Sequence, residues 1–141
     1  MSGPTSVAYS TSAHATGGRD GKVHLDNSPI WFAMAIPKVM GGSGLGSNPE
    51  QMFAMGFASC FNSAVLFVAA QKKLDASKAK VTCEVGIGRN EAGGFALQAK
   101  LTVSIPGLDA AQAKDVVETA HQVCPYSNAT RGNMPVELVI V

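Results

Sequence analysis

One long, almost uninterrupted apolar segment constrains this chain more than any other feature. Within residues 52–70, only small or amide-bearing residues interrupt the apolar run: Gly56, Ser59, Asn62 and Ser63. Asn48 suits an N-cap, Pro49 suits the first helical position, and Gln51 stands where a capping box places its third residue. The segment therefore predicts a helix of about 25 residues, which would be about 37 Å long at 1.5 Å per residue.

Two environments suit such a helix. Its apolar length is enough to cross a bilayer. The segment is, however, the only one of its kind, and the strands predicted on either side of it are bounded by turn signals and are typical of a soluble protein. A helix that is apolar on all sides is otherwise typical of a buried core. We therefore expect a central, fully buried helix and no membrane association.

Length and composition narrow the class of protein. A chain of 141 residues is the right size for one domain, which we expect to span residues 1–141. Only 15% of its residues are charged, against roughly 25% in an average domain, and this shortage hints at a buried partner interface. The net charge of +1 comes without a basic patch, which excludes typical nucleic-acid binding. The N-terminus lacks the features of a secretory signal, so we expect a cytoplasmic protein.

Short strands are predicted before the long helix. Apolar and polar residues alternate along residues 7–13, and GGRDG then makes a turn around Arg19. Further strands are expected near Lys22–Leu25 and Ile30–Ile36, separated by the turn signal DNSP. Residues 38–48 form a glycine-rich loop without the ending of a phosphate loop, which favours flexibility or close backbone approach.

Two strands, a second helix and a last strand are predicted after the long apolar helix. Alternating patterns cover residues 80–88 and 95–105, joined by the hairpin loop RNEAGG. A second helix begins at the cap Asp109, with Gln112 completing a capping box, and it ends before Pro125. Its apolar stripe consists of Ala113, Val116, Val117, Ala120, Val123 and Cys124. With a last strand at Pro135–Val141, the order strand(3)-helix-strand(2)-helix-strand predicts an α+β fold.

Three cysteines are the candidates for chemistry. Cys60, Cys83 and Cys124 match no zinc spacing, and an odd number in a reducing compartment argues against a disulfide framework. Cys60 lies within the apolar helix and Cys124 at a corner expected to be mobile, which suits a peroxide-reducing pair of the sulfenic-acid type. Buried filler is the alternative for both, and Cys83 is expected to be core. His121, one turn before Cys124, could tune that thiol or simply complement the helix dipole.

Three motifs carry a resemblance to a known family. GGRDG, NPEQMFAMGFASCF and HQVCPYSNATRGN, in this order, resemble the organic hydroperoxide resistance (Ohr) subfamily of the OsmC/Ohr thiol peroxidases. The resemblance extends from about Ala13 to the C-terminus, although the segment HLDNSPIWFAM differs from the usual sequence of the family. It implies that Cys60 is the peroxidatic cysteine, that Cys124 is the resolving cysteine, and that Arg19 and Glu50 are the polar partners that activate Cys60.

The same resemblance implies substrates and assembly. Alkyl, aryl or fatty-acid hydroperoxides would be reduced to alcohols through a sulfenic acid and a Cys60–Cys124 disulfide. Dihydrolipoamide or a lipoylated protein would be the reductant, and no metal, haem or flavin would be needed. The subunits would form an intertwined homodimer with central helices wrapped by β-sheets. Apolar residues near Cys60 are candidates for the substrate pocket: Phe57, Phe61, Met55 and Tyr126. A sister-subfamily (OsmC) peroxidase and a non-catalytic carrier of an apolar ligand remain the alternatives.

Helix geometry adds a constraint on the predicted site. Glu50 and Cys60 are ten residues apart on one predicted helix, which separates them by about 15 Å along its axis. An extended arginine spans only part of that distance. Either the helix breaks near Gly56, or Arg19 and Glu50 reach Cys60 from a second subunit. The apolar character of the helix on all sides and the low charge content favour the second alternative.

Overall fold

The structure of the chain is a computed structural model that describes residues 3–141, and it divides into two compact units. The first unit ends at Pro49 and the second is Glu50–Val141. One domain over residues 1–141 therefore stays a prediction.

The N-terminal unit is built on a three-stranded antiparallel sheet. Its strands, in the spatial order β1-β2-β3, are β1 (Ala13–Thr16), β2 (Lys22–Leu25) and β3 (Trp31–Ala33). A short 3₁₀ helix, η1 (Gly18–Asp20), joins β1 to β2, and a second, η2 (Lys38–Met40), follows β3. Asn27 takes up a positive φ of 55° in the turn after β2, a conformation that asparagine tolerates.

Two expectations for this unit differ from the structure. The first strand begins only at Ala13, because β2 pairs with Ala13–Thr16 and the preceding alternating residues, Val7 and Tyr9 among them, are exposed. The third strand is shorter than expected, although Met34 continues it as an isolated bridge to Ser47. The glycine-rich loop does allow close backbone approach, since a Cβ at Gly42 would lie 2.1 Å from the carbonyl oxygen of Ile36.

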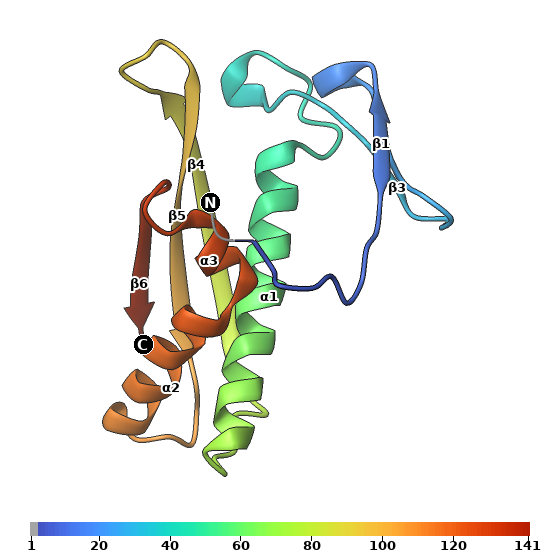
Figure 1. Cartoon of the computed structure of the whole chain (residues 1–141). Coiled ribbons are helices and arrows are strands. Elements are labelled where there is room, and N and C mark those ends of the chain that lie inside the picture. Colours follow the sequence, from blue (N-terminus) through green and yellow to red (C-terminus); the bar gives the residue numbers. More distant parts are fainter. Residues whose placement is uncertain (1–2) are drawn as a thin grey trace. The chain divides into compact units, whose positions relative to one another are not determined.

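The second unit holds the three helices and the other sheet, as Figure 1 shows. In chain order its elements are α1 (Pro49–Gln71), β4 (Lys80–Arg89), β5 (Phe95–Ser104), α2 (Ala110–Val123), α3 (Pro125–Thr130) and β6 (Val136–Ile140). The sheet order is β4-β5-β6, with β4 and β5 antiparallel and β5 and β6 parallel. The predicted α+β class is confirmed.

The core of this unit lies between one face of the sheet and helices α1 and α2. Alternate residues of β5 point inward, with Ala99, Leu101 and Val103 buried. They belong to one cluster with buried residues of both helices. The period-2 pattern of β5 and the 3.6-residue pattern of α2 thus meet in a single apolar layer.

Helix α1 is buried on one side only, which corrects the expectation of full burial. Phe57, Phe61 and other residues of one face are inaccessible to solvent, whereas Met55, Leu66 and Phe67 are 52%, 41% and 56% exposed. One sheet face and one neighbouring helix can cover only part of a cylinder. By length and composition alone α1 could cross a membrane, but its buried face forms the core of a small domain.

Helix α2 begins as predicted and ends in a feature that was not predicted. The Asp109 carboxylate accepts a hydrogen bond from the Gln112 N–H at 2.8 Å, and the Gln112 side chain accepts one from the Asp109 N–H at 3.1 Å. Val123 lies outside the buried stripe and is exposed. From Pro125 the chain forms α3, a six-residue helix that was not predicted.

Candidate functional site

The two cysteines of interest lie in contact within the second unit. Cys60 lies in the middle of α1, and Cys124 is both the residue that ends α2 and the one that precedes α3. Although they are 64 residues apart in sequence, the Cys124 Sγ lies 3.7 Å from the Cys60 Sγ, in position to donate a hydrogen bond to it. Cys124 is fully buried and Cys60 is partly accessible.

This contact is close enough for chemistry between the two thiols. Both are free, and 3.7 Å is a non-bonded distance, whereas a disulfide requires about 2.05 Å. Cys83, by contrast, lies on β4 and packs against the core cluster, where burial raises the pKa of its thiol.

The acidity of Cys60 is set by opposing contacts. Burial raises the pKa of the Cys60 thiol, the backbone N–H of Tyr126 lowers it by donating to the sulfur, and the adjoining Cys124 thiol raises it again. The net direction is upward. Within this environment Cys60 favours the thiol form, so a nucleophilic thiolate would need a further cationic partner.

Aromatic rings surround Tyr126 beside Cys60. The ring centroid of Tyr126 lies 6.0 Å from that of Phe53 and 5.7 Å from that of Phe57. Gly56 leaves the space that the Tyr126 ring occupies, because a Cβ there would lie 2.7 Å from the tyrosine hydroxyl oxygen. Thr130 ties the segment together by donating from its hydroxyl to the Tyr126 carbonyl oxygen at 2.9 Å.

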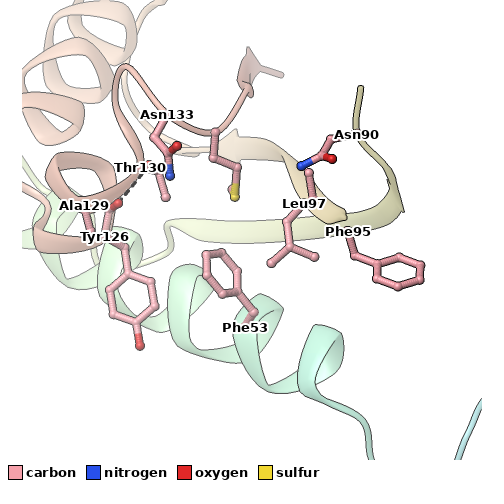
Figure 2. A pocket seen from close by; sticks show the side chains of 10 residues that line it. Phe53, Asn90, Phe95, Leu97, Tyr126, Ala129, Thr130 and Asn133 are labelled. Atoms are coloured by element: carbon pink, nitrogen blue, oxygen red, sulfur yellow. Dashed lines mark hydrogen bonds between the residues drawn. The ribbon is translucent and has the colours of Figure 1, made fainter. Parts of the chain in front are cut away.

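A cavity of about 520 Å³ lies beside Phe53 and Tyr126. Figure 2 shows Phe53 and Tyr126 side by side on one wall, from α1 and α3, with Leu97 of β5 facing them. Its lining is mainly apolar with a few amide and hydroxyl groups: Phe53, Asn90, Phe95, Ala96, Leu97, Tyr126, Ala129, Thr130, Asn133 and Met134.

Only one of the four predicted pocket residues lines this cavity. Tyr126 does so. Phe57 and Phe61 lie on one face of α1 and are fully buried in the core, whereas Met55 lies on the exposed face of α1. Pocket roles for these three stay predictions.

The predicted polar partners lie on two different elements. Arg19 is in η1 of the N-terminal unit, and Glu50 is in the first turn of α1. Helix α1 runs through Gly56 without a break, which excludes the first of the two alternatives. Glu50 and Cys60 of one chain are therefore separated by about 15 Å along the helix axis. The grouping of Arg19 and Glu50 around Cys60 stays a prediction.

Several groups at the site could not be read from residue types. The Tyr126 N–H acts through the backbone, and its direction depends on the turn that begins α3. Phe53 resembles any other apolar residue of α1. Gly56 carried a usable signal, because a glycine inside an apolar helix often marks close packing by a neighbouring side chain.

The structure provides no ready metal site in the part of the chain that it describes. Across residues 3–141, no group of three or more histidine, cysteine, aspartate or glutamate side chains is placed to hold a metal ion.

Comparison with known proteins gives a consistent picture. Residues 41–139 match the family described as OsmC-like protein. The chain is 44% identical to the organic hydroperoxide resistance protein of Xanthomonas axonopodis pv. citri, over 99% of both chains.

Solved structures extend the comparison to the fold. A crystal structure of a putative organic hydroperoxide resistance protein from Vibrio cholerae, with captopril bound in one of its active sites, has a TM-score of 0.93 and 48% identity. The match covers 96% of this chain and 94% of that one. The OhrB structure from Bacillus subtilis has a TM-score of 0.85 and 34% identity, covering 96% of this chain and 100% of that one.

Proposed function

The chain belongs to the OsmC-like family, and on that basis we propose that it is a cysteine-based peroxidase that reduces organic hydroperoxides to alcohols. Its relatives are named for organic hydroperoxide resistance, which supports a role in resistance to peroxides. A cytoplasmic location is part of the proposal, because a reducing compartment returns thiols to the free state between cycles.

The contact between Cys60 and Cys124 is the observation that carries this proposal. A pair of free thiols at 3.7 Å, one accessible and one buried, is the arrangement that a two-cysteine peroxidase needs. The accessible sulfur can meet the peroxide. The buried sulfur is protected from it and is near enough to attack the oxidised partner.

The proposed reaction has three balanced steps. The Cys60 thiolate attacks one oxygen of ROOH, the O–O bond breaks, and the products are a sulfenic acid and, after protonation, the alcohol ROH. The Cys124 sulfur then attacks the sulfenic sulfur, the S–O bond breaks, and water leaves as the disulfide forms. An external dithiol reduces that disulfide and becomes a disulfide itself.

Arg19 and Glu50 supply the activation in this proposal. A guanidinium about 4 Å from a thiolate, at an effective dielectric constant near 20, is worth about 4 kcal/mol. It would act against the upward shift of the Cys60 pKa, of which burial is the largest cause. The Glu50 carboxylate would provide the counter-charge that a buried arginine needs and would orient its side chain.

We further propose that the site is shared between two subunits of a homodimer. On an unbroken α1, ten residues separate Glu50 from Cys60 by about 15 Å along the axis and by about 80° around it. The exposed apolar residues of α1, which include Met55, Leu66 and Phe67, lie opposite its buried face. Packing the α1 helices of two copies together would cover these residues and bring Arg19 and Glu50 of one subunit toward Cys60 of the other.

The apolar surroundings of Cys60 favour bulky alkyl, aryl or fatty-acid hydroperoxides over hydrogen peroxide. A carbon-rich substrate gains free energy when it leaves water for a surface such as that of Phe53 and Tyr126. Dihydrolipoamide or a lipoylated protein is the proposed dithiol reductant.

Steady-state turnover tests the proposal. The protein should reduce tert-butyl or cumene hydroperoxide rapidly with dihydrolipoamide, and much more slowly with glutathione or thioredoxin. Slower reduction of hydrogen peroxide than of cumene hydroperoxide is expected, and the reverse preference would favour the sister OsmC subfamily. A carrier of apolar ligands would show no turnover and would keep all three thiols after one equivalent of peroxide.

A further inference from the structure

Cys124 lies in a corner that a side-chain hydrogen bond closes around it. His121 and Ser127 stand three residues before and three residues after Cys124. The His121 Nδ1 and the Ser127 Oγ lie 2.9 Å apart, which is a hydrogen bond between the last turn of α2 and the first turn of α3. Ser127 is fully buried, so this bond also satisfies a hydroxyl that would otherwise be costly to bury.

A second hydrogen bond, from Arg131 to His121, crosses the same corner. The Arg131 guanidinium, just after α3, donates to the His121 carbonyl oxygen and to the Asn128 side-chain oxygen. The His121 side chain is therefore bonded to the first turn of α3, and its carbonyl oxygen is bonded to the residue that follows α3. The extended backbone at Cys124, with ψ of 122°, is held between these two attachments.

The His121 ring also reaches the helix that carries the other cysteine. Its centroid lies 6.4 Å from that of Phe61, the residue that follows Cys60. One side chain thus contacts the helix of Cys60 and bonds to the corner of Cys124. The contact at 3.7 Å between the two sulfurs depends on how these elements are held relative to one another.

We propose that His121, through its hydrogen bond to Ser127, is a positioning residue for the disulfide-forming step. The bond keeps the corner closed, so that the Cys124 sulfur stays within reach when Cys60 becomes a sulfenic acid. This inference rests on the proposed peroxidase cycle. It assigns His121 no contact with the peroxide and no proton transfer.

The consequence is a competition between two fates of the sulfenic acid. Cys124 can attack it and release water, or a second peroxide can oxidise it to a sulfinic acid while being reduced to a second alcohol. A loosened corner slows only the first of these. Loss of positioning therefore appears as over-oxidation at lower peroxide concentration.

Two variants remove the hydrogen bond from either side. His121→Phe keeps a ring against Phe61 and removes Nδ1, and Ser127→Ala removes the hydroxyl. Each should lower the peroxide concentration that gives half-maximal Cys60 sulfinic acid by about fivefold, the factor that one ordinary hydrogen bond is worth. Mass spectrometry of the Cys60 peptide across a cumene hydroperoxide titration, with dihydrolipoamide present, gives this value.

Three further proteins separate positioning from general stability. His121→Asn offers an amide near the place of Nδ1 and should restore the wild-type value, while the double variant should be no worse than either single one. Gln122→Ala, on the exposed side of α2, is the matched control and should behave as wild type. If His121→Phe does not fold, Ser127→Ala carries the test.

The possible outcomes are distinct. If His121→Phe and Ser127→Ala both form Cys60 sulfinic acid at the same peroxide concentration as the wild-type protein, the positioning role is overturned. It is also overturned if His121→Asn is as sensitive to peroxide as His121→Phe. If the wild-type protein itself forms neither sulfenic acid nor disulfide, the proposed function fails first. If the two variants are over-oxidised at lower peroxide concentration while the wild-type protein forms its disulfide, both the peroxidase function and the positioning role of His121 are supported.

Discussion

The Tyr126 ring fills the space that Gly56 leaves open on helix α1. A Cβ at Gly56 would lie 2.7 Å from the Tyr126 hydroxyl oxygen and 3.1 Å from two ring carbons. The glycine therefore sets how closely the segment after Cys124 approaches the helix that carries Cys60. Because the Tyr126 N–H donates to the Cys60 sulfur, this packing affects the acidity of the thiol.

Gly56→Ala should raise the pKa of Cys60. The Tyr126 ring must shift, and the donation from its N–H then weakens. Stability should change little, since the gain of about 1 kcal/mol in helix propensity opposes the steric cost. Ultraviolet absorbance of the thiolate, measured without the other two cysteines (Cys83→Ser, Cys124→Ser), reports this pKa. Gly88→Ala on β4, where a Cβ meets no atom within 4 Å, is the control. An unchanged pKa in Gly56→Ala would contradict the account.

Cys60→Ser should abolish turnover with every peroxide and every reductant. A serine hydroxyl is neither acidic enough nor nucleophilic enough to attack an O–O bond. Cys83→Ser, a change in the core of the same unit, should retain most of the activity and serves as the matched control. Substantial peroxidase activity in Cys60→Ser would show that another residue performs the first step.

A shared site predicts that two inactive variants complement each other. Cys60→Ser and Arg19→Ala should each be inactive alone. In a mixed dimer one site would carry both defects and the other neither, so up to half of the activity per dimer should return. Phe67→Glu places a charge on the exposed face of α1 and should prevent dimer formation. A monomeric wild-type protein, or no recovery once mixed dimers are demonstrated, would refute the shared site.

The pH dependence of stability should depend on His121. Burial, and to a lesser extent the charge of Arg131, hold the pKa of His121 below its usual value of 6.5. Below about pH 6.5 the unfolded chain therefore binds more protons than the folded one, and the free energy of unfolding falls as the pH drops. Urea denaturation at pH 7.5 and 5.5 should show a larger loss for wild type than for His121→Asn. Equal losses would mean that His121 titrates alike in both states.

The elements that depend on local patterns were largely predictable from sequence. The alternation of β4 and β5, and the Asp109 cap, require only neighbouring residues. The alternation of Val7 and Tyr9 misled because a strand also needs a partner at the right register, and β2 pairs instead with Ala13–Thr16. The short helix α3 was missed because six residues carry little periodicity.

The site was predictable only in part, and for a physical reason. Nothing local in the surroundings of Cys60 and Cys124 implies that their sulfurs touch, since that contact depends on the packing of α1 against the α2–α3 corner. The roles of Cys60 and Cys124 as a peroxidatic and a resolving cysteine came from the resemblance to a known family. The Tyr126 N–H and the His121–Ser127 bond depend on backbone direction and on a turn, neither of which residue type reveals.

Peptide mapping after one equivalent of tert-butyl hydroperoxide would show directly whether Cys60 and Cys124 act as a redox pair. The account predicts an intramolecular disulfide between Cys60 and Cys124, with Cys83 remaining a free thiol. In Cys124→Ser the same treatment should leave a sulfenic acid on Cys60 that further peroxide over-oxidises. A disulfide to Cys83, or three free thiols after the peroxide has been added, would contradict the claim.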